Sequence, residues 1–206
     1  MASLPQSVMA YATAPTVLPT DAAGSLDMYY KPSYSTTPIM GYPGFLSTYS
    51  VTLSSPGHPL AAFTDSRFDT STHAQGAFVQ GFGNQQVPSS APTVDLGSGI
   101  MAKEFPNALL GTTEIVWQEG RWTVRVSGTS APPDSEASAV VAFLHRYFMP
   151  VPTTSGGISV HVTPTGTQAT VSWTSGSELL LVRAYPGAAS PAETALGMAI
   201  SMRSYK

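Results

Sequence analysis

The chain has 206 residues and a formal net charge of −3; 42% of its residues are hydrophobic and only 10% are charged. This charged fraction is far below the roughly 25% of an average globular protein, and Ser, Thr, Gly and Pro fill the gap, which favours strands and turns over long helices. The sequence has no basic run that would support nucleic-acid binding, no apolar run near the ~20 residues of a transmembrane helix, and no Cys for disulfides or thiolate chemistry.

The first 45 residues are rich in Pro and Tyr. Six prolines between positions 5 and 43 exclude a long helix there, because proline lacks a backbone N–H and clashes with the preceding turn. Tyrosines such as Tyr29 and Tyr30 indicate an arm that lies on a protein surface, since disordered tails are usually poor in aromatic residues. We therefore expect residues 1–45 to form an extended arm and residues 46–206 to form one α+β domain.

Short strands are expected in the next part of the chain. Residues 49–53 alternate apolar and polar side chains, which is the period-2 pattern of a half-buried strand. Pro and Ser residues mark a loop after the last of these strands. The expected strands span residues 47–53, 60–64 and 76–83, and the loop spans residues 84–93.

A candidate metal or hydrolytic site falls within this region. Asp65, Asp69 and His73 are residue types that bind hard metal ions or serve in hydrolysis. Their spacing of four residues would bring them together only on a helix, and the Gly, Ser and Thr neighbours favour a polar surface loop. These three residues are the first choice if the protein binds a metal, but no cofactor is expected.

The C-terminal half contains an imperfect internal duplication, which spans residues 94–148 and 157–203. A Trp and a Gly recur at the same spacing in the two copies, as Trp117 with Gly120 and as Trp173 with Gly176. A short repeated unit buries its apolar face against its neighbour, so a duplication constrains the whole architecture. Each copy is expected to contain three strands followed by a helix.

The expected elements of the first copy are strands at residues 100–105, 113–118 and 121–127 and a helix at residues 136–148. Those of the second copy are strands at residues 158–163, 168–173 and 178–184 and a helix at residues 192–202. The two β-β-β-α units predict an α+β fold with an antiparallel sheet and both helices on one face. Extra N-terminal strands and the extended arm complete the expected fold.

Several other candidate sites have a structural explanation. The segment Gly97–Ala102 matches the pattern G-x-G-x-x-A of a nucleotide-binding loop, but no helical pattern follows it, so we interpret it as a turn. Glu114 is expected on the solvent side of its strand and Glu119 at the tip of a hairpin. His145 and His161 are expected on the surface, and neither has a partner at the spacing of a catalytic triad.

The first hairpin of the duplication is the favoured place for a binding surface. The tryptophans that recur in both copies are expected to anchor the core. Trp122 has no aromatic counterpart in the second copy, which makes it the tryptophan expected to be most exposed. The first hairpin also carries charges that the second lacks. The candidate binding residues are therefore Trp122, Glu119, Arg121 and Arg125, together with Tyr29 and Tyr30 of the arm.

The segment Ile115–Val124, which reads IVWQEGRWTV, resembles a phrase found in uncharacterised extracytoplasmic or lipoprotein-type domains of Gram-positive bacteria. Val171–Gly176 and Ala195–Met202 are similar to the same domains, and the resemblance covers residues 94–203. It implies a secreted or surface-tethered α+β domain and supplies no catalytic residue.

Three functional hypotheses follow. The leading one is a non-enzymatic extracytoplasmic module that contacts an unknown protein or a component of the cell envelope, with homo-oligomerisation left open. The alternative is binding of a small ligand or carbohydrate in the groove between sheet and helices. The third is metal-dependent hydrolysis at Asp65, Asp69 and His73.

The location is expected to be extracytoplasmic or secreted, with a cytoplasmic location as the alternative. The composition rich in Ser, Thr and Pro and poor in Lys favours the first. Residues 1–10 lack the positive segment and the apolar segment of a signal peptide, so we expect either a cytoplasmic protein or the mature form of a secreted one.

Overall fold

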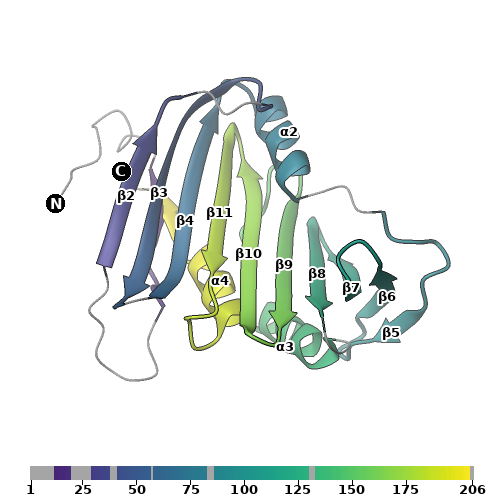
Figure 1. Cartoon of the computed structure of the whole chain (residues 1–206). Helices are drawn as coiled ribbons and strands as arrows, with labels where there is room; N and C mark the ends of the chain where they lie inside the picture. Colours follow the sequence, from purple (N-terminus) through teal and green to yellow (C-terminus); the bar gives the residue numbers. More distant parts are fainter. Residues whose placement is uncertain are drawn as a thin grey trace.

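The computed structural model describes residues 12–19, 29–37, 41–56, 58–82, 86–129 and 133–204. Over these residues the protein is a mixed α+β structure with three helices and one large, mainly antiparallel sheet (Figure 1). The expected fold class is confirmed at this level. No helix of the described part is long and apolar enough to cross a membrane.

Ten strands form the main sheet, and all neighbouring pairs are antiparallel except β8 and β9, which run parallel. A separate antiparallel pair joins β1 (Thr13–Pro15) to β12 (Met202–Ser204). From one edge of the main sheet to the other, the strands are β2 (Tyr29–Ser35), β3 (Phe45–Ser55), β4 (His58–Phe68), β11 (Glu178–Ala184), β10 (Gly166–Ser175), β9 (Gly156–Thr163), β8 (Trp122–Gly128), β7 (Thr112–Glu119), β6 (Met101–Asn107) and β5 (Thr93–Asp95).

The three helices of the described chain cover both faces of the sheet. Consecutive residues of a strand point to opposite faces, so Gly156 and Gly157 of β9 identify the two faces. Phe82 lies over Gly157, whereas Trp122 lies over Gly156. Figure 1 shows α2 near one end of the strands and the other two helices near the opposite end. The helices are α2 (Ser71–Phe82), α3 (Asp134–Arg146) and α4 (Pro191–Ile200).

The main core lies between the sheet and helices α3 and α4. Trp122 and Trp173 both belong to it, with ring centroids 6.1 Å apart and ring planes tilted by 53°. The buried residues of both helices recur at helical spacing, which is the amphipathic pattern expected from the sequence. They are Ala137, Val140 and Val141 of α3 and Ala192, Ala195, Leu196, Met198 and Ala199 of α4.

Helix α2 replaces the strand that we expected at residues 76–83. Ala74, Ala77 and Phe78 are its buried residues, and their spacing places them on one helical face. Gly76 and Gly81 lower the helix propensity of this segment, which obscured the helical pattern in the sequence. The low helix propensity of the segment is offset by packing of this face against β4, β10 and β11, which stabilises the helix.

The N-terminal region contributes strands. Residues 29–35, within the segment expected as an arm, form the edge strand β2, which pairs with β3. After β5 the elements follow in the order of three strands, α3, three strands and α4. The parallel pairing of β8 with β9 joins the two groups of strands into one sheet.

Candidate functional site

The tip of the β7–β8 hairpin is held against the segment that leaves α3. The hairpin turns at Gly120, whose φ is +60°. Arg121 Nη1 donates hydrogen bonds to the carbonyls of Pro152 and Thr153, at 3.0 and 2.9 Å. Trp122 Nε1 donates to the carbonyl of Pro150 at 3.1 Å. These bonds hold residues 150–153, which form neither helix nor strand, against the hairpin.

Apolar side chains of this segment are exposed beside the hairpin tip. Phe148 is 100% exposed, Val151 is 81% exposed and Tyr147 is 42% exposed. They line a cavity of about 510 Å³ whose other wall is the hairpin tip, Glu119–Trp122. We call this feature the hairpin-tip cavity. Clustered apolar side chains around a concavity are typical of contact surfaces.

The structure places Trp122 in the core, like Trp117 and Trp173, which corrects the expectation that its side chain is exposed. Its side chain is only 6% exposed and its ring lies directly over Gly156. A side chain at position 156 would place Cβ 2.5 Å from the ring, so the space that Trp122 fills depends on this glycine. Trp122 therefore contributes a buried wall to the hairpin-tip cavity.

Glu119 lies at the rim of the hairpin-tip cavity. Its Oε2 accepts a hydrogen bond from Trp117 Nε1 at 3.3 Å, and its Oε1 lies 4.0 Å from His145 Nε2. Both Glu119 and His145 are partly exposed. The structure thus brings together three expected binding residues, Glu119, Arg121 and Trp122, and adds an apolar surface to them.

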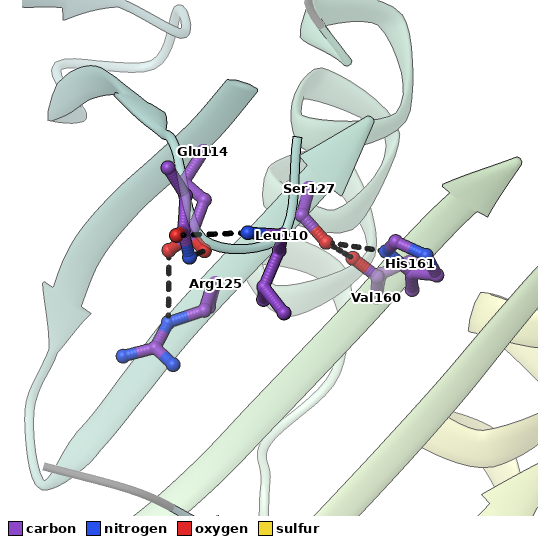
Figure 2. A network of polar contacts seen from close by, with 7 residues as sticks. Leu110, Glu114, Arg125, Ser127, Val160 and His161 are labelled. Carbon is purple, nitrogen blue, oxygen red and sulfur yellow. Dashed lines mark hydrogen bonds and ion pairs between the residues drawn. The ribbon is translucent and has the colours of Figure 1, made fainter. Parts of the chain in front are cut away.

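Arg125 lies on the other face of the sheet, in a second cavity of about 870 Å³. This cavity lies between α2, the chain at residues 86–87 and strands β6–β8, and we call it the sheet cavity. The Arg125 guanidinium carbon lies 5.7 Å from the centre of the Phe82 ring. Arg125 Nε lies 3.5 Å from Glu114 Oε2 (Figure 2).

Glu114 is 1% exposed, which corrects the expectation of a solvated carboxylate. Its Oε1 accepts a hydrogen bond from Asn107 Nδ2 at 2.5 Å, and the Oδ1 of Asn107 accepts one from the backbone N–H of Leu110 at 3.4 Å. The loop between β6 and β7 therefore covers this part of the second face. Simple alternation along β7 could not reveal that cover.

Ser127 and His161 form a neighbouring pair, also visible in Figure 2. Ser127 Oγ lies 2.8 Å from His161 Nδ1 and donates a hydrogen bond to the carbonyl of Val160 at 3.4 Å. Ser127 is buried. Within the described residues no hydrogen bond links a carboxylate to His161, and Glu114 is engaged by Asn107 and Arg125. The pair therefore lacks the third member of a hydrolytic triad.

The structure brings together two of the three candidate metal ligands. His73 Nδ1 lies 2.5 Å from Asp69 Oδ1, at the start of α2. This hydrogen bond lowers the pKa of Asp69. Asp65 instead lies in β4, where its Oδ2 accepts a hydrogen bond from Thr13 Oγ1 at 2.9 Å. Among the described residues, no group of three His, Asp or Glu side chains could hold a metal ion.

Asp65 is a fully buried carboxyl in the main core, at 0% exposure. Burial, together with the charge of Glu178, raises its pKa to about 7, against the opposing hydrogen bond from Thr13. Burial likewise raises the pKa of Tyr49, whose hydroxyl donates to the carbonyl of Thr13. The two side chains attach β1 to the sheet.

Tyr29 and Tyr30 lie on strand β2, where their backbones pair with Ser54 and Leu53. Their side chains lie outside the described part of the structure.

The sites expected from the sequence did not include residues 147–151 or the α2 wall of the sheet cavity. Tyr147 and Phe148 were expected within the helix at residues 136–148, whereas α3 ends at Arg146 and leaves both side chains exposed. No signal in the sequence marked the α2 wall.

Comparison of the chain with protein-family models, curated proteins and solved structures found no match.

Proposed function

We propose that this protein is a non-enzymatic binding module that holds a segment of a partner protein at the hairpin-tip cavity. The observation that carries the proposal is the exposure of Phe148, Val151 and Tyr147 around a concave surface. Burying apolar side chains of this size contributes about 2 kcal/mol each, which makes them the expected centre of an interface.

The rigid backbone beneath these side chains supports the same proposal. Arg121 and Trp122 hold the carbonyls of Pro150, Pro152 and Thr153, so the segment is ordered before any partner arrives. A surface that is already ordered loses less conformational entropy on binding, and more of the contact energy then appears as affinity.

The side chains that line the hairpin-tip cavity indicate which kind of partner segment it would bind. An extended partner segment with one or two apolar side chains would fill the cavity, and a Lys or Arg beside them would face Glu119 at the rim. A second copy of this chain is the competing occupant, and sedimentation of the purified protein over a concentration series distinguishes it.

We also propose that the fold contains an internal duplication. One unit consists of β6, β7, β8 and α3, and its copy consists of β9, β10, β11 and α4. Trp117 and Trp173 are buried at the same point of each unit, and Gly120 and Gly176 turn each hairpin with φ of +60° and +61°. The exposed segment after α3 is then a feature that the first unit alone supplies.

We also propose an extracytoplasmic or secreted location, supported by the Ser, Thr and Pro content and the scarcity of Lys. Fractionation of the producing cells, followed by immunoblotting, tests the location. Recovery in the cytoplasmic fraction alone would contradict it.

Selection of random 12-residue peptides displayed on phage against the purified full chain tests the binding function. The expected result is enrichment of peptides that share apolar residues next to a basic residue, and NMR shifts on peptide addition that centre on residues 119–122 and 147–152. Failure to enrich any sequence family, or shifts centred elsewhere, would overturn the proposal.

A further inference from the structure

The geometry points to a second binding site, for a small organic carboxylate with an apolar body, in the sheet cavity. This site is independent of the proposed protein contact because it lies on the opposite face of the sheet, on the side of Gly157 and Phe82. Its volume of about 870 Å³ falls within the range of clefts that bind small ligands.

The walls of the sheet cavity are largely apolar. Helix α2 supplies Phe78 and Phe82, whose rings stack at 5.5 Å with an interplanar angle of 9°. Val116 and Met101 face them from the sheet, and Met101 is strongly exposed. These groups suit an aliphatic or aromatic body, which would leave water on entering the cavity.

Helix α2 is fixed in place as a wall. Gln75 Nε2 donates to Ser155 Oγ at 2.9 Å, and Thr154 Oγ1 donates to Gln75 Oε1. Gly157 has no side chain, so the Phe82 ring can lie directly on β9. The cavity is therefore bounded by elements that hydrogen bonds and close packing hold together.

Two cations give the sheet cavity its charge. The charge of Arg125 is balanced by buried Glu114. Lys103 Nζ donates to the carbonyl of Ala91 at 3.0 Å and to Thr93 Oγ1 at 2.8 Å, both of which are neutral. No ion pair within the described residues includes Lys103. The cavity thus carries one positive charge without an anionic partner, which favours an anionic ligand.

Arg125 is held in an orientation that suits a carboxylate. Its Nε edge faces Glu114 and its guanidinium lies over Phe82. In Figure 2 the two terminal nitrogens of Arg125 point away from Glu114. A planar guanidinium fixed on one edge can still offer its terminal N–H groups to a carboxylate, and its orientation is set before the ligand binds.

Isothermal titration of the full chain with three probes tests this site. The probes are 4-phenylbutyrate, decanoate and the neutral analogue 4-phenylbutanamide. We expect at least one carboxylate to bind about tenfold or more tightly than the amide, with NMR shifts at Phe82, Lys103, Val116 and Arg125. Tighter binding of 4-phenylbutyrate would assign an aromatic body, and tighter binding of decanoate an aliphatic one.

Two variants test the role of the charged groups. Glu114→Gln combined with Arg125→Gln removes both charges while leaving a neutral polar pair, so the fold should persist, and circular dichroism checks this. The preference for carboxylate over amide should then fall about tenfold. Lys103→Gln should weaken carboxylate binding without changing amide binding. Phe148→Ser, at the hairpin-tip cavity, is the control that should leave both affinities unchanged.

Equal affinity of the wild-type chain for carboxylate and amide would overturn the inference. So would the absence of saturable binding of both carboxylates at millimolar concentration, or shifts that map outside the sheet cavity. None of these results would affect the peptide contact at the hairpin tip, and loss of that contact would not affect this site.

Discussion

At the scale of single residues, the protein contains ionisable side chains in places where charge is costly. Asp65 and Glu114 are both buried, but different groups offset the cost of burying their carboxyls. Glu114 accepts a hydrogen bond from the Asn107 amide and lies 3.5 Å from the Arg125 guanidinium, whereas Asp65 accepts a hydrogen bond from the Thr13 hydroxyl. Within the described residues, one oxygen of each carboxyl has no hydrogen-bond partner. Burial disfavours the charged form of a carboxyl, and it accordingly raises the pKa of Asp65 to about 7.

Asp65 should make the protein less stable as pH rises from about 4 to about 7. In this window the folded protein retains a proton that the unfolded chain has already released, because its pKa rises from 3.8 to about 7 on folding. The free energy of unfolding should fall by a few kcal/mol at most, since each unit of pKa difference between the folded and unfolded states corresponds to about 1.4 kcal/mol. Asp65→Asn should flatten the dependence of Tm on pH, measured between pH 4 and 8. An unchanged slope in that variant would contradict the assignment.

Arg125→Gln alone should destabilise the protein by about 3 kcal/mol, because it leaves the Glu114 carboxylate buried without a cation. The double change Glu114→Gln with Arg125→Gln should cost clearly less, since no buried charge remains. Urea denaturation of the wild type, both single variants and the double variant completes the cycle. Additive costs would show that the two side chains do not interact.

At the scale of elements, the sequence predicted the hairpins well and helix α2 not at all. Alternation and the turn glycines Gly120 and Gly176 predicted β7, β8, β10 and β11 to within about two residues at each end, the usual uncertainty of element boundaries. These signals are local. Helix α2 depends on packing of Ala74, Ala77 and Phe78 against the sheet, and its glycines weaken the local signal.

The helical state of α2 can be tested at Gly76, which is exposed and has open space where a Cβ would lie. Gly76→Ala should raise the free energy of unfolding by about 1 kcal/mol, and Gly76→Val by about half as much, because Val is the poorer helix former. Thermal denaturation of both variants measures the difference. The opposite order, with Val more stabilising than Ala, would indicate a strand instead.

From the sequence, only those residues of the candidate sites that lie together on the β7–β8 hairpin could be expected to be close in space. Glu119, Arg121 and Trp122 line one cavity because they are neighbours in sequence. The buried state of Trp122 could not be predicted, since it depends on a segment that returns after α3 and on Gly156. The cover over Glu114 depends on Asn107 and the next loop in the same way. Alternation assigns the two faces of a strand but does not show what lies over them.

At the scale of the whole molecule, one buried cluster extends from Tyr49 and Leu53 in β3 to Met198 in α4. The ten strands form one sheet, and the parallel pairing of β8 with β9 continues it through the middle. From the sequence we expected an antiparallel sheet and not this parallel junction, although β8, α3 and β9 follow in the strand-helix-strand order that permits two parallel neighbours.

The continuous core predicts a single cooperative unfolding transition. All three tryptophans lie in the C-terminal half, so their fluorescence reports on that half, whereas far-UV circular dichroism reports on all strands. The two urea curves should coincide. Separate midpoints would mean that β2, β3 and β4 unfold independently of the rest.

The central claim is that the exposed apolar side chains at the hairpin-tip cavity bind a partner segment. Its most direct test is the Kd of one selected peptide for two double variants of the full chain, measured by fluorescence anisotropy. Phe148→Ser with Val151→Ser should weaken binding by tenfold or more. Leu109→Ser with Leu110→Ser removes two other strongly exposed apolar side chains from another loop and should leave Kd within about twofold of the wild type. Equal weakening by both variants, or by neither, would contradict the claim.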